Sequence, residues 1–288
     1  MTTSIHVTGM SVDTDALQLS GRIARPCTDS RGLVLALHGG TYDSGYYDLG
    51  PDSLLELGAF LGYTVVALDR PGYGRTTDCD REFLSFSAQT QILAAAVDKV
   101  ADDLALTDRV VLVGHSIGGM LALRVASETT TALQGVEVSG MGSLWQPGLR
   151  EMWASMISDA PDLVLPAQDH AHVMFGPADT YADAQVERNA QLLRPLPTPE
   201  LVDAVQWSTA LPSAAAKITV PVSLTLAEHD NIWQSSAEAR AALAGQFTSA
   251  PTVRMDQFSH AGHSIELHHG ARAYVLRQLA FVEECLAP

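Results

Sequence analysis

Basic residues and cysteines are scarce in this sequence of 288 residues. Lysine and arginine together number 17 against 33 aspartates and glutamates, which gives a formal net charge of −16. Such an acidic surface repels nucleic-acid phosphates and anionic membranes, so neither is an expected partner. The 3 cysteines have separations that fit no metal motif, and their odd number does not indicate a disulfide framework. A reduced, cytoplasmic setting is therefore expected.

Long apolar runs are also missing. No stretch reaches the roughly 18 apolar residues that a membrane span needs. The first residues have neither a basic start nor an apolar core, so no signal peptide is expected. The hydrophobic fraction of 47% and the charged fraction of 17% are typical of a well-buried globular core. The length fits one large domain, or one domain with an insertion.

Short, continuous runs of β-branched and aliphatic residues are what the sequence does contain. Such runs indicate strands that are buried on both faces. They occur at residues 33–37, 64–68, 110–113, 136–139, 222–226 and 252–255. Helical patterns lie between them, at residues 53–61, 88–104, 120–126 and 235–243. This alternation predicts an α/β fold with a mostly parallel sheet, and it places functional groups at the carboxyl ends of the strands.

The segment from about residue 141 to residue 211 has a different character. It has no clear strand, it is rich in tryptophan and methionine, and it separates two strands by far more than a usual connection. We interpret it as a helical cap over the carboxyl edge of the sheet, which divides the chain into 1–140, 141–212 and 213–288. Thr198 is expected to cap a helix that has Pro199 in its first turn. Trp145 and Trp153 are tentative contacts for an apolar substrate.

The strongest motif is Gly114-His115-Ser116-Ile117-Gly118. It fits the pattern Gly-x-Ser-x-Gly and stands directly between a predicted strand and a predicted helix, which is the context that makes the pattern credible. The glycines leave room for a tight turn, and the helix N-terminus favours developing negative charge. Ser116 is therefore the predicted nucleophile. His115 is expected to pack or hydrogen-bond locally, and it is kept as a tentative substrate contact.

Together with other short motifs, this serine turn resembles the α/β-hydrolase superfamily. The other motifs are His38-Gly39-Gly40, the run from Asp69 to Gly74, a late carboxylate and the late pair Gly262-His263. The similarity extends from about residue 30 to the C-terminus. It implies a mostly parallel, eight-stranded sheet flanked by helices with an inserted helical cap. It also implies a catalytic triad in the order serine, carboxylate, histidine, which needs no metal and no organic cofactor.

The order of the triad selects its base and its acid. His263 is the expected base because it lies in a loop between the last predicted strand and a helical run, and His260 is its rival. Asp230 is the expected acid, with Glu228 as the alternative. The position after the fourth strand, where some family members carry the acid, has no carboxylate, which favours Asp230. We expect the two further histidines at 268 and 269 to lie in the final helix, pointing away.

The oxyanion formed on attack needs two N–H donors. One is expected from the backbone of Ile117, the residue after the nucleophile. By resemblance, the other comes from Gly40, or from Thr41 if the loop is shifted by one residue. Thr41 and Tyr42 are also tentative substrate contacts, although the tyrosines of this loop could equally anchor it on the cap.

A serine nucleophile, rather than an aspartate, disfavours the opening of epoxides and the removal of halides. The sequence therefore predicts a hydrolase that cleaves an ester or thioester of an apolar small molecule through an acyl-enzyme on Ser116. Two alternatives stay open. The same triad could serve an acyltransferase, a cyclase or a carbon–carbon bond hydrolase, or the scaffold could be a non-catalytic ligand receptor. The oligomeric state is left open.

Overall fold

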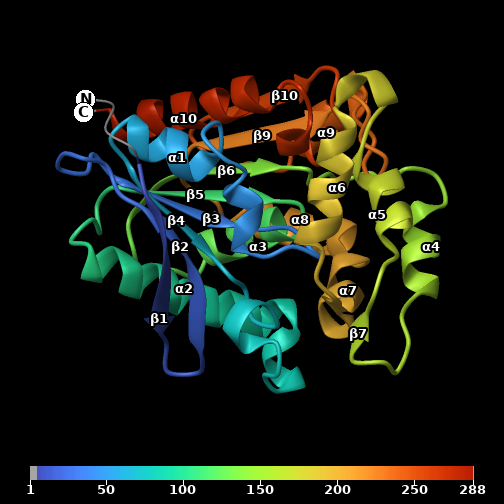
Figure 1. Cartoon of the computed structure of the whole chain (residues 1–288), viewed down its shortest axis with the longest axis horizontal. Coiled ribbons are helices and arrows are strands. Elements are labelled where there is room, and N and C mark those ends of the chain that lie inside the picture. Colours follow the sequence, from blue (N-terminus) through green and yellow to red (C-terminus); the bar gives the residue numbers. More distant parts are fainter. Residues whose placement is uncertain (1–4, 288) are drawn as a thin grey trace.

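An eight-stranded sheet forms the centre of the computed structural model, which describes residues 5–287 (Figure 1). Its strands lie in the order β1-β2-β4-β3-β5-β6-β9-β10. Their bounds are β1 Val7–Asp13, β2 Gln18–Ala24, β3 Leu33–Leu37, β4 Thr64–Leu68, β5 Val110–His115, β6 Leu133–Ser139, β9 Val222–Ala227 and β10 Val253–Phe258. β2 pairs antiparallel with β1 and β4, and the other neighbouring pairs are parallel. The expected mostly parallel, eight-stranded sheet is confirmed.

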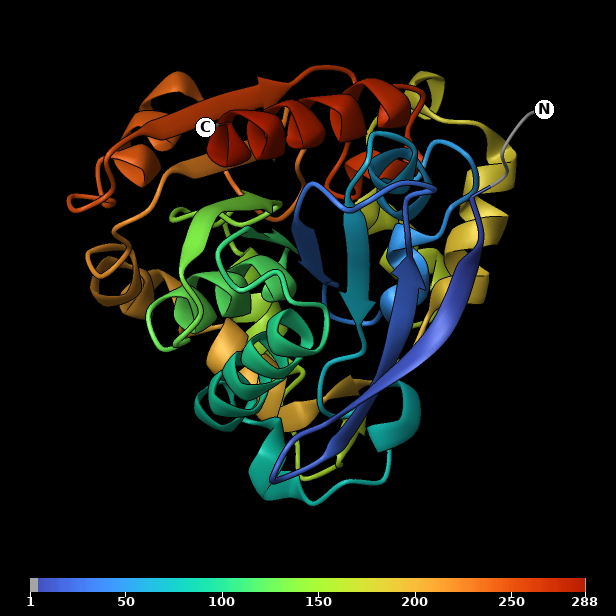
Figure 2. The ribbon, with the colours of Figure 1, turned by 90° about the vertical axis from the view of Figure 1, so that its left-hand side faces the viewer.

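The six strands expected from apolar runs are β3, β4, β5, β6, β9 and β10. The expected bounds of β3 and β4 match those of the structure. No apolar run predicted β1 and β2, because both strands have exposed residues among buried ones instead of continuous burial. They form a hairpin at one edge of the sheet, and β10 lies at the other edge (Figure 2).

Helices cover both faces of the sheet. Their bounds are α1 Leu54–Phe60, α2 Phe86–Asp103, α3 Ile117–Ala126, α9 Ala237–Ala244 and α10 Ala271–Leu286. Because side chains alternate along a strand, neighbouring residues of β3 face different layers. Leu35 joins the apolar cluster that includes α2 and α3, whereas Val34 joins the cluster that includes α1 and α10. In the described part of the chain, no helix is both long and apolar enough to cross a membrane.

Residues 140–221 connect β6 to β9, and we call this segment the insertion (at the right in Figure 1). Its elements are α4 Leu149–Ser155, β7 Asp162–Leu163, α5 Ala167–Met174, α6 Asp183–Leu192, β8 Leu196–Pro197, α7 Thr198–Ala204 and α8 Trp207–Ala215. Sequence patterns did not predict β7 and β8, which have two residues each and pair with each other. Helix α8 packs on α3 of the core, so the insertion is attached to the sheet through that helix.

Two local predictions about helix ends are wrong. Helix α7 begins at Thr198 and its N-cap is Pro197, so Thr198 lies in the first turn and does not cap it. His268 and His269 lie before α10 rather than in it. His268 is buried, and its Nε2 accepts a hydrogen bond from the amide of Gly262 at 2.9 Å. The ring therefore holds the loop before His263 instead of pointing away from it.

Candidate active site

Ser116 stands at the junction of β5 and α3 in a strained backbone conformation. Its φ of 53° and ψ of −120° lie in a region that residues other than glycine rarely adopt. The turn is fixed on both sides. The Ser116 amide donates to the carbonyl of Ser139 at 2.8 Å, and the Ser116 carbonyl accepts from the amide of Met120 at 3.1 Å. These bonds present a half-buried serine at the carboxyl end of the central strand.

The two glycines of the motif are required by close approach of the backbone. A Cβ atom on Gly114 would lie 2.6 Å from the carbonyl oxygen of Gly118. A Cβ atom on Gly118 would lie 2.0 Å from the carbonyl oxygen of Leu37. Neither contact can be relieved by a rotating side chain, because the atoms that would be met belong to the backbone. The spacing of the motif therefore reflects how tightly α3 packs against β5 and the end of β3.

His263 and Asp230 form a fully buried pair. His263 Nδ1 lies 3.0 Å from Asp230 Oδ2 and 3.2 Å from Oδ1. Asp230 Oδ1 also accepts from the amides of Ile232 at 2.8 Å and Trp233 at 3.0 Å, which fixes the carboxylate. Because Nδ1 faces the carboxylate, it carries the proton of the neutral ring, and Nε2 is the basic nitrogen. Nε2 is buried and has no hydrogen-bond partner among the described residues.

The His263 ring lies at the same edge of the sheet as Ser116. Its centroid is 5.0 Å from that of His115, the residue before the serine. A Cβ atom on Gly140, which follows β6, would lie 3.0 Å from His263 Cε1. No hydrogen bond joins His263 Nε2 to Ser116 in this conformation. Catalytic hydrogen bonds of this kind often tighten only when substrate binds.

The rival residues for base and acid lie outside this pair. His260 and Glu228 are exposed, and they contact each other, because the His260 amide donates to Glu228 Oε2 at 2.9 Å. The structure thus brings Asp230 and His263 together in the interior and the two rivals together at the surface.

The loop after β3 carries Gly40, one of the two expected oxyanion donors, and the other, Ile117, is the first residue of α3. A Cβ atom on Gly40 would lie 2.8 Å from Cδ1 of Ile117, so the loop packs directly on the start of α3. Within the part of the chain that the structure describes, the amides of Gly40 and Ile117 have no hydrogen-bond acceptor. The amide of Thr41, by contrast, donates to the hydroxyl of Tyr73 at 3.3 Å. This geometry favours Gly40 over Thr41 as the second donor.

A buried ion pair, which sequence reasoning missed, holds this loop. The guanidinium of Arg70 donates to the carbonyls of His38 at 2.9 Å and Gly39 at 3.1 Å. It also makes two bonds to the carboxylate of Glu200 in α7, and both side chains are fully buried. Burial lowers the pKa of Arg70, but the Glu200 carboxylate more than offsets this effect and the pKa is raised overall. The loop is thereby tied to the insertion through a charge pair.

Further polar side chains complete the shell around Glu200. Tyr73 donates its hydroxyl to Glu200 Oε1 at 3.0 Å, and Gln89 donates its amide to Oε2 at 2.9 Å. Every charged group of this buried cluster is therefore hydrogen-bonded, as a low-dielectric interior requires. The signal available in the sequence was weak. Arg70 lies in the run from Asp69 to Gly74, which is marked in the sequence only as a motif of the family, and Glu200 follows Pro199 at an expected helix start.

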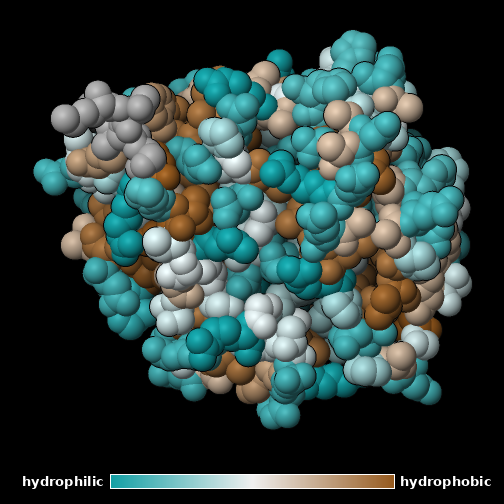
Figure 3. All heavy atoms as spheres, viewed as in Figure 1, coloured by the Kyte–Doolittle hydropathy of each residue, from teal (hydrophilic) through white to brown (hydrophobic). Residues whose placement is uncertain are grey.

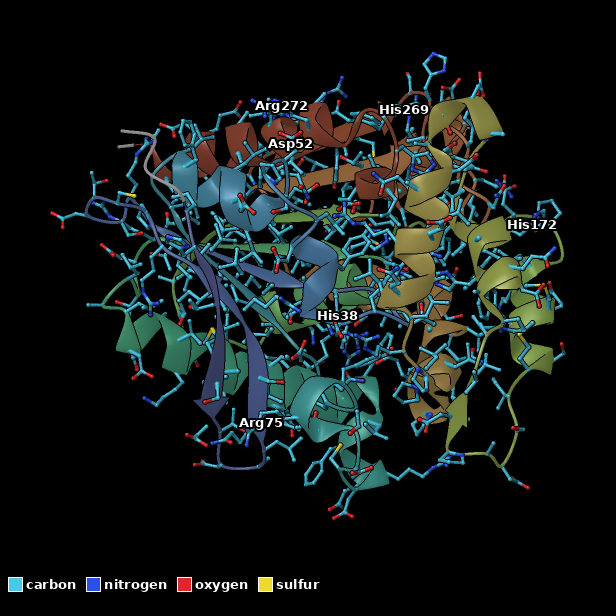
Figure 4. The ribbon with its side chains drawn as sticks, viewed as in Figure 1. His38, Asp52, Arg75, His172, His269 and Arg272 are labelled. Carbon is cyan, nitrogen blue, oxygen red and sulfur yellow. The ribbon has the colours of Figure 1, made fainter. Side chains whose placement is uncertain are left out.

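His38 is a neutral part of the same cluster (Figure 4). Its Nδ1 donates to the carbonyl of Gly39 at 2.8 Å, and its Nε2 accepts from the amide of Arg70 at 3.2 Å. Burial, with the nearby Arg70 charge, lowers the pKa of His38 to about 3. The ring acts here as a fixed donor and acceptor that shapes the turn.

Two of the tentative substrate contacts are packed into the interior. His115 is buried, stacks on Tyr46 with centroids 4.8 Å apart, and hydrogen-bonds Ser139 Oγ at 3.1 Å. Tyr42 is buried and donates its hydroxyl to Asn189 of α6 at 2.7 Å. Neither side chain lines the cavity at Ser116. Tyr42 thus anchors the loop on the insertion, which was the other role considered for these tyrosines.

An apolar cavity of about 60 Å³ lies at Ser116. Five of the residues singled out from the sequence contribute to its walls: Gly40, Thr41, Ile117, Trp145 and Trp153. The first three come from the core and the tryptophans come from the insertion. The insertion therefore forms part of the enclosure of Ser116.

A larger groove of about 1100 Å³ lies on the other side of two shared wall residues, Trp153 and Leu165. Its remaining walls come from α4, α5 and the loop after β9, including His229 and Asp230. Val164, at its rim, is 72% exposed. In Figure 3, apolar side chains gather over this part of the insertion, at the lower right of the view.

Comparison with known proteins identifies the family. A model of the alpha/beta hydrolase family matches residues 33–275. The chain belongs to this family. Among solved structures, this hydrolase is similar to a thermostable carboxyl esterase from Bacillus coagulans, with 17% identity, 98% and 99% of the two chains covered and a TM-score of 0.73. It is also similar to a monoglyceride lipase variant from Saccharomyces cerevisiae, with 16% identity, 99% and 96% covered and a TM-score of 0.75.

A third similar structure is an N-acyl homoserine lactonase, with 13% identity, 98% of each chain covered and a TM-score of 0.69. A search of curated protein sequences finds no match. At these identities the similar structures establish the fold of this hydrolase, and the reaction has to be argued from the site itself.

Proposed function

We propose that this chain is a serine hydrolase that cleaves an ester or thioester of an apolar small molecule through an acyl-enzyme on Ser116. One observation carries the proposal. A buried imidazole, His263, is oriented by Asp230 and keeps its other nitrogen free, at the sheet edge where a strained turn presents Ser116. A free serine hydroxyl is a poor nucleophile, and an oriented base of this kind is what activates it.

The proposed reaction follows from this arrangement. His263 Nε2 takes the hydroxyl proton as Ser116 Oγ attacks the carbonyl carbon of the substrate. The negative charge that develops on the carbonyl oxygen accepts hydrogen bonds from the amides of Gly40 and Ile117. The bond to the leaving oxygen or sulfur then breaks, and His263 returns the proton to it. A water molecule repeats the sequence on the acyl-enzyme and releases the acid.

The walls of the cavity support an apolar substrate. Around Ser116 they consist mostly of aliphatic and aromatic side chains, including Trp145 and Trp153. Burial of an apolar group there gains about 25 cal/mol for each Å² removed from water. The carboxyl esterase and the monoglyceride lipase, which have the same fold, bear names that denote ester cleavage, which agrees with this substrate class.

A panel of nitrophenyl esters and acyl thioesters of increasing chain length tests the proposal. We expect hydrolysis by the wild-type chain and none by Ser116→Ala. The matched control is Ser127→Ala, at the far end of α3, which should retain full activity. Turnover of carrier-bound acyl thioesters with short esters untouched would instead favour the acyltransferase or cyclase alternative. Equal activity of the wild type and Ser116→Ala would overturn the proposal.

A further inference from the structure

The two rivals for the triad, Glu228 and His260, form a group with His229. Glu228 and His229 follow β9, and His260 follows β10, which is its parallel neighbour in the sheet. One potential ligand atom of each side chain lies within 4.8 Å of those of the other two. Glu228 and His260 are exposed and His229 is half-buried, so a solvated ion has access to all three.

Backbone hydrogen bonds fix the two loops relative to each other. The amide of Glu228 donates to the carbonyl of Phe258 at 2.9 Å, and the amide of His229 donates to that of Ala261 at 3.0 Å. The His260 amide donates to Glu228 Oε2 at 2.9 Å, and the same oxygen lies 3.8 Å from His229 Nε2. The backbone that carries the three side chains is therefore fixed before an ion binds, so binding costs little backbone conformational entropy.

The chemistry of this donor set selects a class of cation. Two imidazoles and one carboxylate suit Zn²⁺ and related first-row transition ions, whereas Ca²⁺ and Mg²⁺ prefer sites made of oxygen alone. The triad does not need His229 or His260 as its base, because His263 is already paired with Asp230.

We propose that Glu228, His229 and His260 bind one divalent transition-metal ion, with Zn²⁺ as the type ion, and that this ion links the two loops that carry Asp230 and His263. Glu228 lies two residues before Asp230, and His260 lies three residues before His263. Three protein ligands leave one position for water or another small donor. The ion stabilises the folded chain in proportion to its occupancy, because the unfolded chain does not hold the three ligands together.

Calorimetric titration of the metal-stripped full-length chain with ZnCl₂ tests the site. We expect one Zn²⁺ per chain for the wild type, and binding weakened about 10–100-fold by loss of a ligand. The ligand variants are His229→Gln and His260→Asn. Asparagine is chosen because His260 has a φ of 54°, a conformation that asparagine tolerates. The matched control is His269→Gln, an exposed histidine outside the group (Figure 4).

A thermal unfolding series separates metal binding from misfolding. Without metal, all variants should melt as cooperatively as the wild type. With saturating ZnCl₂, the melting temperature should rise for the wild type and for His269→Gln but not for His260→Asn. The proposal is overturned if the wild type binds no Zn²⁺, or if His229→Gln and His260→Asn bind it as tightly as His269→Gln does. Either result would leave the proposed hydrolysis at Ser116 unaffected.

Discussion

The loop that carries Gly40, one of the two expected oxyanion donors, and the loops that carry Asp230 and His263 are held in place in different ways. The first loop is held by the buried ion pair of Arg70 with Glu200. The guanidinium of Arg70 also donates to backbone carbonyls of the loop itself. The second set is held by backbone hydrogen bonds between the two loops, by the ring of His268 and by the pair of Asp230 with His263. One side of the site is thus braced by a buried ion pair that takes no part in the reaction, whereas the contacts that brace the other side include the reacting pair itself.

This difference predicts a separation of effects. A change on the His263 side removes a group that the reaction needs, while most of the hydrogen bonds that fold the loop remain. A change on the Arg70 side leaves a charge buried without its partner, which is one of the most destabilising substitutions known. We therefore expect changes on the His263 side mainly to lower turnover, and changes on the Arg70 side mainly to lower the stability of the folded chain.

The largest effect is expected for Asp230→Asn, which should lower turnover about 10⁴-fold because the wrong tautomer of His263 then faces Ser116. The amide oxygen of asparagine can still accept from Ile232 and Trp233, so the free energy of unfolding should change little. Ester hydrolysis and urea unfolding measure the two quantities. The matched control is Glu228→Gln, which should keep full turnover. A nearly silent Asp230→Asn combined with an inactive Glu228→Gln would reverse the assignment of the acid.

The next largest effect is expected for Glu200→Gln, which should lower the free energy of unfolding by about 3–5 kcal/mol because Arg70 is left without a buried counter-charge. Urea unfolding measures it, with Glu187→Gln, an exposed glutamate of α6, as the control. The double variant Arg70→Met with Glu200→Leu should recover most of the stability. Its turnover should nevertheless be lower than that of the wild type, because Arg70→Met removes the donor to the carbonyls of His38 and Gly39. Full activity of the double variant would break the proposed link between the ion pair and the oxyanion loop.

A smaller effect, on the pH dependence of stability, is expected from two buried carboxyls that are not paired with a basic side chain. Burial raises the pKa of Glu137 to about 8 and that of Glu266 to about 7, although Glu137 accepts hydrogen bonds from Tyr274 and Gln278. Because these folded-state pKa values lie above the unfolded value of 4.5, the folded chain binds more protons in this range. Their contribution to stability is fully present below about pH 4.5 and is lost as the pH rises through about 7 to 8.

Lowered histidine pKa values, such as that of His38, have the opposite effect up to about pH 6.5. Between pH 7 and pH 8 the urea midpoint should therefore decrease as the pH rises, and Glu137→Gln should flatten this decrease. Glu200→Gln should not flatten it, since the Glu200 carboxylate has Arg70 as its partner. An equal slope in the wild type and in Glu137→Gln would contradict the contrast between paired and unpaired buried carboxyls.

The sequence predicted those parts of the site that depend on residues close together in the chain. Ser116 follows from glycine spacing between a strand and a helix, and the apolar runs mark the buried strands. β1 and β2 have mixed burial and left no such run. Glu200 lies 130 residues from Arg70, and the residues around each of them do not indicate that their side chains form an ion pair. His268 was misplaced because its role depends on a contact with Gly262 across a loop.

The most direct test of the account is covalent labelling with a fluorophosphonate, followed by peptide mapping. Such a probe reacts with a serine that is activated by a base and whose developing charge is stabilised. The account predicts one label, on Ser116, that is lost in Ser116→Ala and formed far more slowly in His263→Ala. Absence of the label, or its attachment to another residue while ester hydrolysis persists, would contradict the assignment of Ser116 as the nucleophile.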